Sequence, residues 1–400
     1  MSPPLDLARA RRETPGCEQV VHFNNAGAAL APLAVLRAQT EHLELEARIG
    51  AYEAELHNGE AIDHAYDAVA ALLGCHRDEV AVVESATRAW DAAFYAIPFA
   101  PGDRILASQA EYASNYIAFL QVARRTGAQI VAVPNDEHGQ LSVEALRGLV
   151  DERVKLIAVT HAPTNGGLVN PAEAVGRVAR EASIPFLLDA CQSVGQMPTR
   201  VDALGCDMLS ATGRKYLRGP RGTGFLYVRR ALLERLEPIT LDLHAATWTA
   251  RDHYQIRPDA RRFESWEMSY AGKLGLGVAV DYALGFGLDA IRARVSLLAD
   301  ALRAGLAAVP GVVVRDLGVV RSGIVSFTVE GRAPEEIMRR LRAQGINVWT
   351  SHLPSTRLDM EARGLAGVVR ASVHYYNSED EVDRLREAVR ALACPPGRTS

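Results

Sequence analysis

Seven short apolar segments between residues 79 and 228 constrain the fold more than any other feature of the chain. Their apolar residues are continuous rather than alternating, and longer stretches with helical character, such as 114–126, 142–150 and 172–182, lie between them. Such runs are typical of strands that are buried on both faces of a mostly parallel sheet. We therefore predict an α/β fold built on a mostly parallel, seven-stranded sheet. The seven segments are 79–83, 104–107, 129–133, 155–160, 185–189, 208–210 and 224–228.

The pattern changes after about residue 285. A helical stretch over 288–308 is followed by short strand-like segments that alternate with two further helices, which indicates a separate α+β domain. We therefore predict four parts along the chain. These are an N-terminal segment (1–20), a large domain (21–285), a small α+β C-terminal domain (286–395) and a tail (396–400).

Composition excludes several classes of partner. The net charge is −4 and no basic stripe with interleaved aromatic residues occurs, so we expect no nucleic acid. No apolar stretch reaches membrane-spanning length and the first residues lack a signal-peptide core, so we expect no membrane partner and a cytoplasmic protein. The five cysteines include no CxxC pair, and the eleven histidines show no metal-binding spacing. We therefore expect no disulfide framework and no metal.

Lys215 is one of only three lysines, at positions 155, 215 and 273, in a chain with 44 lysines and arginines. Arginine keeps its proton under ordinary conditions, whereas lysine can lose it and act as a nucleophilic amine. The preceding Thr212, Gly213 and Arg214 offer a hydroxyl, an approachable backbone and a guanidinium, which together suit a phosphate. The turn therefore predicts a Schiff-base lysine beside a phosphate site. The alternative is a solvated turn with incidental basic residues.

Asp189 ends the apolar segment 185–189, and in parallel sheets the ligand lies beyond the carboxyl ends of the strands. A carboxylate in this position could hold a proton on a pyridine nitrogen and make the ring an electron sink. A helix cap or a structural ion pair is the alternative interpretation of Asp189 alone. Asp189 lies one helix–strand unit before Lys215 in the sequence, and this order favours the catalytic interpretation.

In combination these residues resemble the class V aminotransferase-fold enzymes, which use pyridoxal 5′-phosphate and belong to fold type I. The sequence motifs are most similar to those of the cysteine desulfurases and of the isopenicillin-N-epimerase-like branch, which includes cysteine S-conjugate C–S lyases. The resemblance extends from about Phe23 to Leu392. It implies pyridoxal 5′-phosphate as cofactor, a small-molecule amino-acid substrate, and a homodimer with its sites at the subunit interface.

The resemblance implies a role in cofactor binding for ten residues. Lys215 would form the Schiff base and then move the α-proton, Asp189 would pair with the pyridinium nitrogen, and Tyr112 would stack on the ring as a third catalytic residue. Gln192 would contact the phenolic oxygen. Tyr112 could instead be a core aromatic residue. The phosphate would be held by Ala86, Thr87, Arg88, Thr212 and Arg214, with Ser269 supplying a hydroxyl where desulfurases have a nearby threonine.

The resemblance also implies substrate contacts. Arg370 would bind the substrate α-carboxylate, since a guanidinium can pair with a carboxylate through two hydrogen bonds. A surface ion pair is the alternative for Arg370. Thr164 or Asn165 would lie near the substrate. Gly27 and Tyr52 belong to segments that resemble the epimerase-like branch and are further candidates, although Tyr52 could equally serve helix packing.

One absence decides between reactions. Desulfurases need a mobile cysteine as sulfur acceptor, and its counterpart should lie within residues 345–355, where the sequence has none. Cys191 is the one cysteine beside the predicted cofactor, and we expect it to point away. The sequence therefore favours β-elimination from an S-substituted L-cysteine, with decarboxylation as a possible addition. The alternatives are an aminotransferase or amino-acid epimerase, and a non-catalytic regulator with the same fold.

Overall fold

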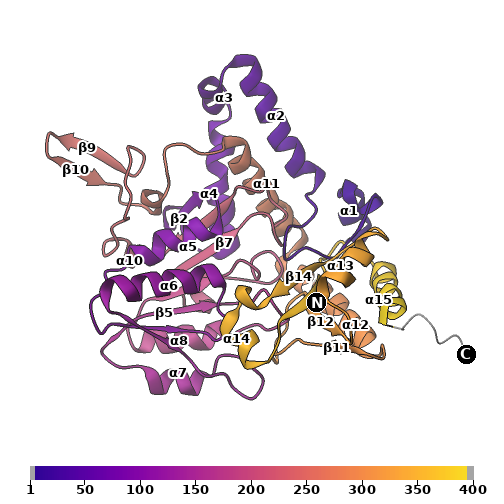
Figure 1. The fold of residues 1–400 in the computed structure, drawn as a ribbon. Helices are drawn as coiled ribbons and strands as arrows, with labels where there is room; N and C mark the ends of the chain where they lie inside the picture. Colours follow the sequence, from indigo (N-terminus) through magenta and orange to yellow (C-terminus); the bar gives the residue numbers. More distant parts are fainter. Residues whose placement is uncertain (1–4, 394–400) are drawn as a thin grey trace, which may run out of the picture.

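The computed structural model describes residues 5–393, and its centre is a seven-stranded sheet (Figure 1). The strand order is β2-β8-β7-β6-β5-β3-β4; the pairs that involve β8 are antiparallel and the remaining pairs are parallel. The predicted mostly parallel sheet is therefore confirmed. The strands are β2 (Val80–Val83), β3 (Arg104–Ala107), β4 (Gln129–Ala132), β5 (Val154–Thr160), β6 (Phe186–Asp189), β7 (Met208–Thr212) and β8 (Gly224–Val228).

Helices cover both faces of this sheet, which explains why its strands are apolar without alternation. In β2, Ala81 and Val83 pack toward the core shared with α5 and α6, while Val80 and Val82 pack on the opposite side with α4 and α8. Successive side chains of a strand point to opposite faces, so both sets must be apolar here. The surrounding helices are α4 (Gly59–Leu73), α5 (Ala86–Tyr95), α6 (Ala113–Thr126), α7 (Val143–Leu149), α8 (Ala172–Glu181), α9 (Val201–Leu204) and α10 (Arg230–Leu233).

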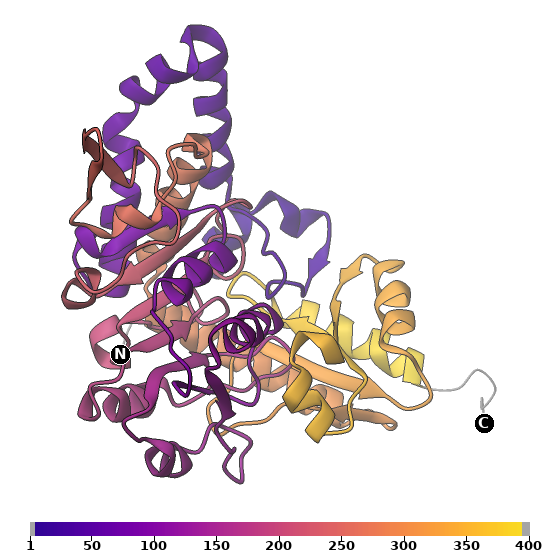
Figure 2. The same cartoon turned by 60° about the vertical axis from the view of Figure 1, so that its left-hand side comes forward.

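A helical arm projects from the large domain (Figures 1 and 2). It consists of α2 (Leu33–Ile49), α3 (Ala51–His57) and the start of α4, and its base packs against α11 (Tyr270–Phe286). A second projection is the hairpin of β9 (Ala246–Ala250) and β10 (His253–Ile256). The sequence had not predicted either projection. The arm exposes the apolar side chains of Leu36, Leu43, Ile49, Tyr52 and Leu56.

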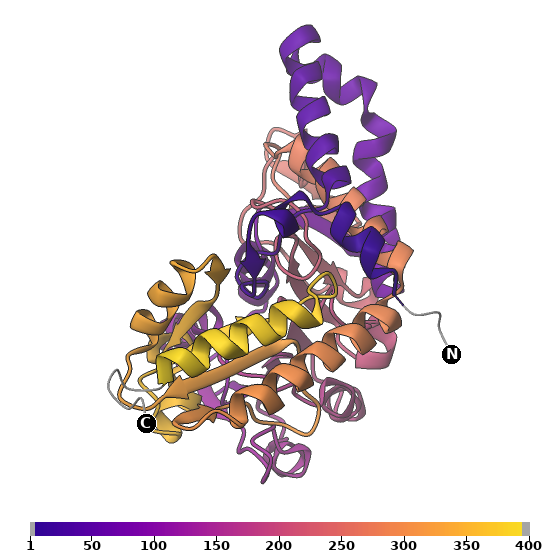
Figure 3. The ribbon, with the colours of Figure 1, turned by 90° about the vertical axis from the view of Figure 1, so that its right-hand side faces the viewer.

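The C-terminal part forms a four-stranded antiparallel sheet in the order β11-β12-β15-β14. In Figure 3, α12 and α15 run side by side across it. The predicted division at residues 285 and 286 falls in the last turn of α11 and remains a prediction, and the predicted tail (396–400) lies outside the described residues. The elements are α12 (Leu288–Ala307), β11 (Val312–Val314), β12 (Ile324–Val329), α13 (Pro334–Arg342), β14 (Trp349–His352), α14 (Arg357–Ala362), β15 (Gly367–Ser372) and α15 (Glu379–Ala393).

The first described residues pack against the C-terminal part of the chain. After α1 (Leu7–Arg12), the short strand β1 (Val21–His22) pairs in parallel with β13 (Ile346–Asn347) of the C-terminal part. Asn24 then forms a bridge with Ser372 at the end of β15. The first residues of the predicted large domain therefore lie against the small one.

Residues 5–393 include neither a single helix suited to cross a membrane nor a cluster of side chains suited to hold a metal ion. No single helix there is long and apolar enough to cross a membrane; only α11 and α12 together, bent by 78°, meet the length and composition criteria. Within the same residues, no three His, Cys, Asp or Glu side chains cluster in a way that could hold a metal ion. The cytoplasmic location stays a prediction.

Candidate active site

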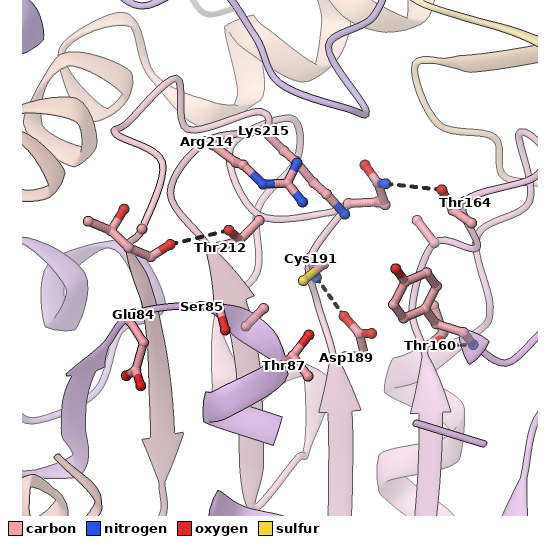
Figure 4. Close-up of a pocket in the computed structure, with 16 residues that line it drawn as sticks. Glu84, Ser85, Thr87, Thr160, Thr164, Asp189, Cys191, Thr212, Arg214 and Lys215 are labelled. Atoms are coloured by element: carbon pink, nitrogen blue, oxygen red, sulfur yellow. Dashed lines mark hydrogen bonds between the residues drawn. The ribbon is translucent and has the colours of Figure 1, made fainter. Parts of the chain in front are cut away.

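A cavity that is partly open to solvent, with about 610 Å³ of empty space, lies beyond the carboxyl ends of β5, β6 and β7 (Figure 4). This is the place where an open parallel sheet binds its ligands. Most of the predicted cofactor residues line it. The lining residues are Glu84, Ser85, Ala86, Thr87, Tyr112, Thr160, Ala162, Thr164, Asp189, Cys191, Gln192, Thr212, Arg214, Lys215, Gly222 and Thr223.

Lys215 lies on the loop after β7 and reaches into the cavity, opposite the strand that ends in Asp189 (Figure 4). Among the described residues its ammonium group has no hydrogen-bond partner and no ion pair within 4.0 Å. Burial lowers the pKa of Lys215, and the positive charges of Arg214 and Arg370 lower it further, against the opposing effect of Asp189. The fraction of neutral, nucleophilic amine is therefore larger than for a lysine in water.

Asp189 is buried at the end of β6, and its two carboxylate oxygens are held from two directions. Oδ2 accepts a hydrogen bond from Nδ2 of Asn115 (3.0 Å) and Oδ1 accepts one from the backbone N–H of Cys191 (2.9 Å). No cation of the described chain lies within ion-pair distance of Asp189. Its carboxylate therefore faces the cavity as an oriented acceptor, and the structural ion pair weighed from the sequence is absent within residues 5–393.

The first turn of α5 forms one wall of the cavity. Ser85 is the N-cap of this helix, and its hydroxyl accepts the backbone N–H of Arg88 at 3.2 Å. Ala86 and Thr87 line the cavity directly. A helix N-terminus with free N–H groups and nearby hydroxyls binds anions well. Gly224 makes this arrangement possible, because a Cβ at that position would lie 2.6 Å from the carbonyl carbon of Ser85.

The phosphate residues predicted from the sequence divide into two groups. Thr212 and Arg214 line the cavity with Ala86 and Thr87, as predicted. The Arg88 side chain does not; it is exposed and lies 3.7 Å from Glu84. Ser269 does not line the cavity either, because it caps α11 through a 3.0 Å bond from the N–H of Gly272. It lines a neighbouring cavity that shares Glu84, Gly222 and Thr223 with the first.

Tyr112 and Cys191 both line the cavity. Tyr112 precedes α6 and is 39% exposed, so it is not the core aromatic residue that the sequence allowed. Cys191 was expected to point away, and this expectation was wrong: the turn after β6 directs its side chain into the cavity beside Asp189 (Figure 4). Burial, and next the negative charge of Asp189, raise the pKa of the Cys191 thiol, so the thiol stays protonated.

Arg370, on β15 of the C-terminal part, is not among the lining residues but lies behind Thr164, which lines the cavity. The residue is only 6% exposed, and its guanidinium donates to the carbonyl (3.1 Å) and the hydroxyl of Thr164 and has no carboxylate partner within the described chain. Nε of Arg370 has no partner at all among these residues. Burial lowers the pKa of Arg370 to about 10. The surface ion pair considered from the sequence is therefore wrong, and the site holds a buried cation without an anion.

The remaining substrate candidates are not brought to the cavity. Asn165 turns toward the small domain, where its Nδ2 donates to Asp359 at 2.6 Å, so Thr164 is the member of this pair at the site. Gly27 lies behind Arg214 and accepts a hydrogen bond from its guanidinium. Tyr52 is 69% exposed on α3 of the arm and does not line the cavity of its own subunit.

Sequence reasoning missed several lining residues. Ser85 could have been found, since a serine before a helical segment is a common N-cap. Thr160 is the last residue of β5 and Thr223 directly precedes β8, but the direction in which their hydroxyls point is decided by packing. No cysteine occurs in the segment 345–355, as the sequence shows. Cys394 lies outside the described residues, and Cys17, Cys75 and Cys206 do not line the cavity.

Unpartnered polar atoms test whether the cavity fits a flat, phosphorylated cofactor. Oε1 of Gln192 is buried without a partner, while its Nε2 donates to the carbonyl of Ala26 at 3.1 Å, and Nζ of Lys215, which lines the same cavity, also has no partner among the described residues. Buried polar groups are normally hydrogen-bonded, so these atoms call for a ligand. A pyridine ring with a hydroxyl, an aldehyde and a phosphate offers partners for all these groups. The residues therefore fit pyridoxal 5′-phosphate.

Comparisons with known proteins give the same assignment. The family model of class-V aminotransferases matches residues 21–385. A probable cysteine desulfurase from Methanothermobacter thermautotrophicus is 29% identical over 96% of this chain and 97% of its own length. The apo cysteine desulfurase from Thermococcus onnurineus superposes with a TM-score of 0.90 at 25% identity, covering 98% of this chain and 99% of that chain.

A cystine C–S lyase, solved in complex with its reaction product cysteine persulfide, has the same fold. It superposes with a TM-score of 0.85 at 23% identity, over 94% of this chain and 99% of that chain. The resemblance recognised in the sequence is thus confirmed. The chain belongs to the class V aminotransferase family, the pyridoxal 5′-phosphate enzymes of fold type I, and within it to the cysteine-desulfurase-like branch.

Proposed function

We propose that this protein is a pyridoxal-phosphate-dependent C–S lyase that cleaves the β C–S bond of an S-substituted L-cysteine. One observation carries the choice of reaction: the cavity of a desulfurase-like fold holds a lysine and a carboxylate, an arginine without a carboxylate partner is bonded to its lining residue Thr164, and segment 345–355 has no thiol. Elimination would release the sulfur substituent as a thiol or sulfenate. The remaining three-carbon enamine would take up water and give pyruvate and ammonia.

The lining residues suggest how the cofactor would be held. Tyr112 would stack on the ring, and Asp189 would accept the proton-bearing ring nitrogen. The N-terminus of α5, with Thr87, Thr212 and Arg214, would bind the phosphate. When bound, the cofactor supplies an electron sink that accepts the charge left on the substrate's α-carbon.

The chain's own residues would then carry out binding and proton transfer. Arg370 would bind the substrate α-carboxylate and thereby gain the anion that its buried guanidinium lacks. Lys215 would remove the α-proton, for which its lowered pKa suits it. Because Arg370 holds the carboxylate, loss of the β-substituent is favoured over loss of carbon dioxide.

The thiol in the cavity does not restore desulfurase chemistry. A sulfur acceptor must attack as a thiolate. Burial and Asp189 keep Cys191 protonated, and it sits beside Asp189 on a short turn after β6 rather than on a mobile loop. The sulfur would therefore leave with its substituent.

Pyruvate release tests the reaction. The purified, cofactor-loaded protein should form pyruvate and a free thiol from S-alkyl-L-cysteines, with little or no alanine and sulfide from L-cysteine. Lys215→Ala should stop this reaction, whereas Lys155→Arg, at a half-buried lysine of β5, should not. Racemisation of the amino acid, consumption of a keto acid, or alanine formation from cysteine would each contradict the lyase assignment.

We also infer a homodimer. The arm exposes a run of apolar side chains on α2 and α3, which a second copy would cover. Tyr52 on the arm and Ser269 in the neighbouring cavity could then serve the partner's site, which would explain why neither lies in its own. Light scattering should give twice the chain mass, and Leu43→Asp with Leu56→Asp should weaken the assembly. A monomeric wild-type protein would rule this out.

A further inference from the structure

A second carboxylate lies directly behind the cavity. Glu111 is only 3% exposed and is not among the lining residues. Four donor groups converge on its two oxygens: the hydroxyl of Ser108 (2.8 Å), Nδ2 of Asn115 (2.8 Å), and the N–H (3.0 Å) and hydroxyl (2.5 Å) of Thr160. No cation of the described chain lies within ion-pair distance. The function proposed above does not use this group.

Glu111 connects to the cavity through two residues, Asn115 and Thr160, the second of which lines it. Nδ2 of Asn115 donates both to Glu111 and to Oδ2 of Asp189, so one amide group bridges two carboxylates. The hydroxyl of Thr160 donates to Glu111 and accepts the backbone N–H of Tyr112 at 3.3 Å. Glu111 therefore holds Asn115, which bonds to Asp189, and Thr160, which bonds to the backbone of Tyr112. Asp189 is the predicted partner of the ring nitrogen, and Tyr112 is the predicted stacking residue.

The arrangement requires an anion-capable side chain at this position. A carboxylate can accept on both oxygens, whereas a glutamine would turn an NH2 group toward donors. Burying two neighbouring carboxylates without a cation is costly. Burial raises the pKa of Glu111 to about 7, and the charge of Asp189 adds to this, while the donors from Thr160, Asn115 and Ser108 oppose it. Among the described residues, Asp189 is the charged group with the largest effect on the pKa of Glu111.

We propose that Glu111 is a positioning residue for Asp189: acting through Asn115, it fixes the carboxylate that meets the cofactor's ring nitrogen. Its negative charge next to Asp189 also strengthens the hold of Asp189 on the ring proton, because a nearby anion favours a protonated nitrogen. The inference rests on the cofactor binding proposed above, and it is independent of which bond of the substrate breaks.

The first test uses the cofactor-loaded protein. Glu111→Gln should bind pyridoxal 5′-phosphate about tenfold more weakly, as expected when a charged hydrogen-bond acceptor is lost. The pH midpoint of the bound cofactor's absorption should fall by about half a unit, since an anion near the ring has been removed. Asn115→Ala should weaken binding similarly while leaving Glu111 in place, and it keeps the test available if Glu111→Gln does not fold.

A matched control exists in the small domain. Glu381 is also buried and accepts from Nδ2 of Asn377 (2.9 Å), with the same spacing of four residues, although unlike Glu111 it is paired with Arg11 at 2.9 Å. Glu381→Gln should lower the melting temperature without moving the absorption midpoint or the cofactor affinity. An equal spectral shift in Glu381→Gln, or an unchanged affinity and midpoint in both Glu111→Gln and Asn115→Ala, would overturn the positioning role.

A second test needs no cofactor, so its failure is distinguishable from failure of the proposed function. In the cofactor-free protein, the infrared C=O band of a protonated carboxyl should appear on acidification with a midpoint that Asp189→Asn lowers, and Glu111→Gln should remove this band. A midpoint that Asp189→Asn leaves in place would show that the two carboxylates are uncoupled and refute the inference. A wild type that binds no pyridoxal 5′-phosphate would instead refute the cofactor assignment on which the positioning role depends.

Discussion

Replacing Arg370 with methionine should make the substrate-free protein more stable and the enzyme far less active. The pKa of Arg370 is lowered from 12.5 to about 10 by burial, and each pKa unit corresponds to about 1.4 kcal/mol. Keeping this guanidinium charged in the fold therefore costs about 3 kcal/mol. Its hydrogen bonds to Thr164 return about 1–2 kcal/mol, so Arg370→Met should gain about 1–2 kcal/mol in the free energy of unfolding.

The same change removes the proposed partner of the substrate carboxylate. Losing a charge-assisted pair should cost about 3 kcal/mol of transition-state binding, or about a hundredfold in kcat/KM. Differential scanning calorimetry of the substrate-free, cofactor-loaded protein measures the first effect as a higher melting temperature. Pyruvate formation from an S-alkyl-cysteine measures the second.

Arg303 provides the matched control. It is as buried as Arg370 and lies in the same domain, but it is paired with Asp316 at 2.7 Å. Arg303→Met leaves an unpaired carboxylate and should destabilise the protein by about 3–5 kcal/mol. If Arg370→Met lowers the melting temperature as Arg303→Met does, the argument from the unpaired charge is refuted.

Four further changes have defined outcomes. Lys215→Ala should abolish the cofactor adduct that borohydride fixes to a lysine peptide in the wild type, and mass spectrometry of the digest will show whether another lysine carries it instead. Cys191→Ala should keep kcat within about threefold, because the thiol is protonated; a fall beyond about tenfold would give the thiol a role. Glu111 has a folded-state pKa raised from 4.5 to about 7, so the fold holds its proton more tightly than the unfolded chain does. Its stabilising contribution is complete below pH 4.5 and should be lost as the pH rises through 7, by at most about 3 kcal/mol, and urea titrations should show no such component in Glu111→Gln. Gly224→Ala should lower stability by about 1–3 kcal/mol and weaken cofactor binding, since its Cβ would press on the backbone of Ser85; an unchanged melting temperature would contradict this.

Much of the fold could be predicted because the relevant signals are local. The strands of the large sheet are buried on both faces, so each appears as a continuous apolar run, and all seven runs became strands. The arm was not predicted, because α2 and α3 expose apolar side chains. From the sequence alone, such side chains are expected to pack in the core. The pairing of β1 with β13 joins residues more than 300 positions apart, and no local pattern encodes it.

The site residues also divide into those that local sequence marks and those that only the tertiary structure places. Asp189 and Lys215 could be found because a strand end and a glycine-rich turn mark their positions in the sequence. Cys191 was assigned the wrong direction, since the side that a turn residue faces depends on the backbone around it. Asn165 and Thr164 are adjacent in sequence, yet Asp359 of the small domain draws one away and Arg370 holds the other at the cavity.

The sequence by itself determined the class of fold, the family, the candidate Schiff-base lysine and the absence of a thiol in segment 345–355. These are properties of residue type and local spacing. The tertiary structure decided that Arg370 is a buried cation without an anion, and that Glu111 reaches Asp189 through Asn115. Both depend on burial and on contacts between separate elements, which set the cost of a charge and therefore what it can bind.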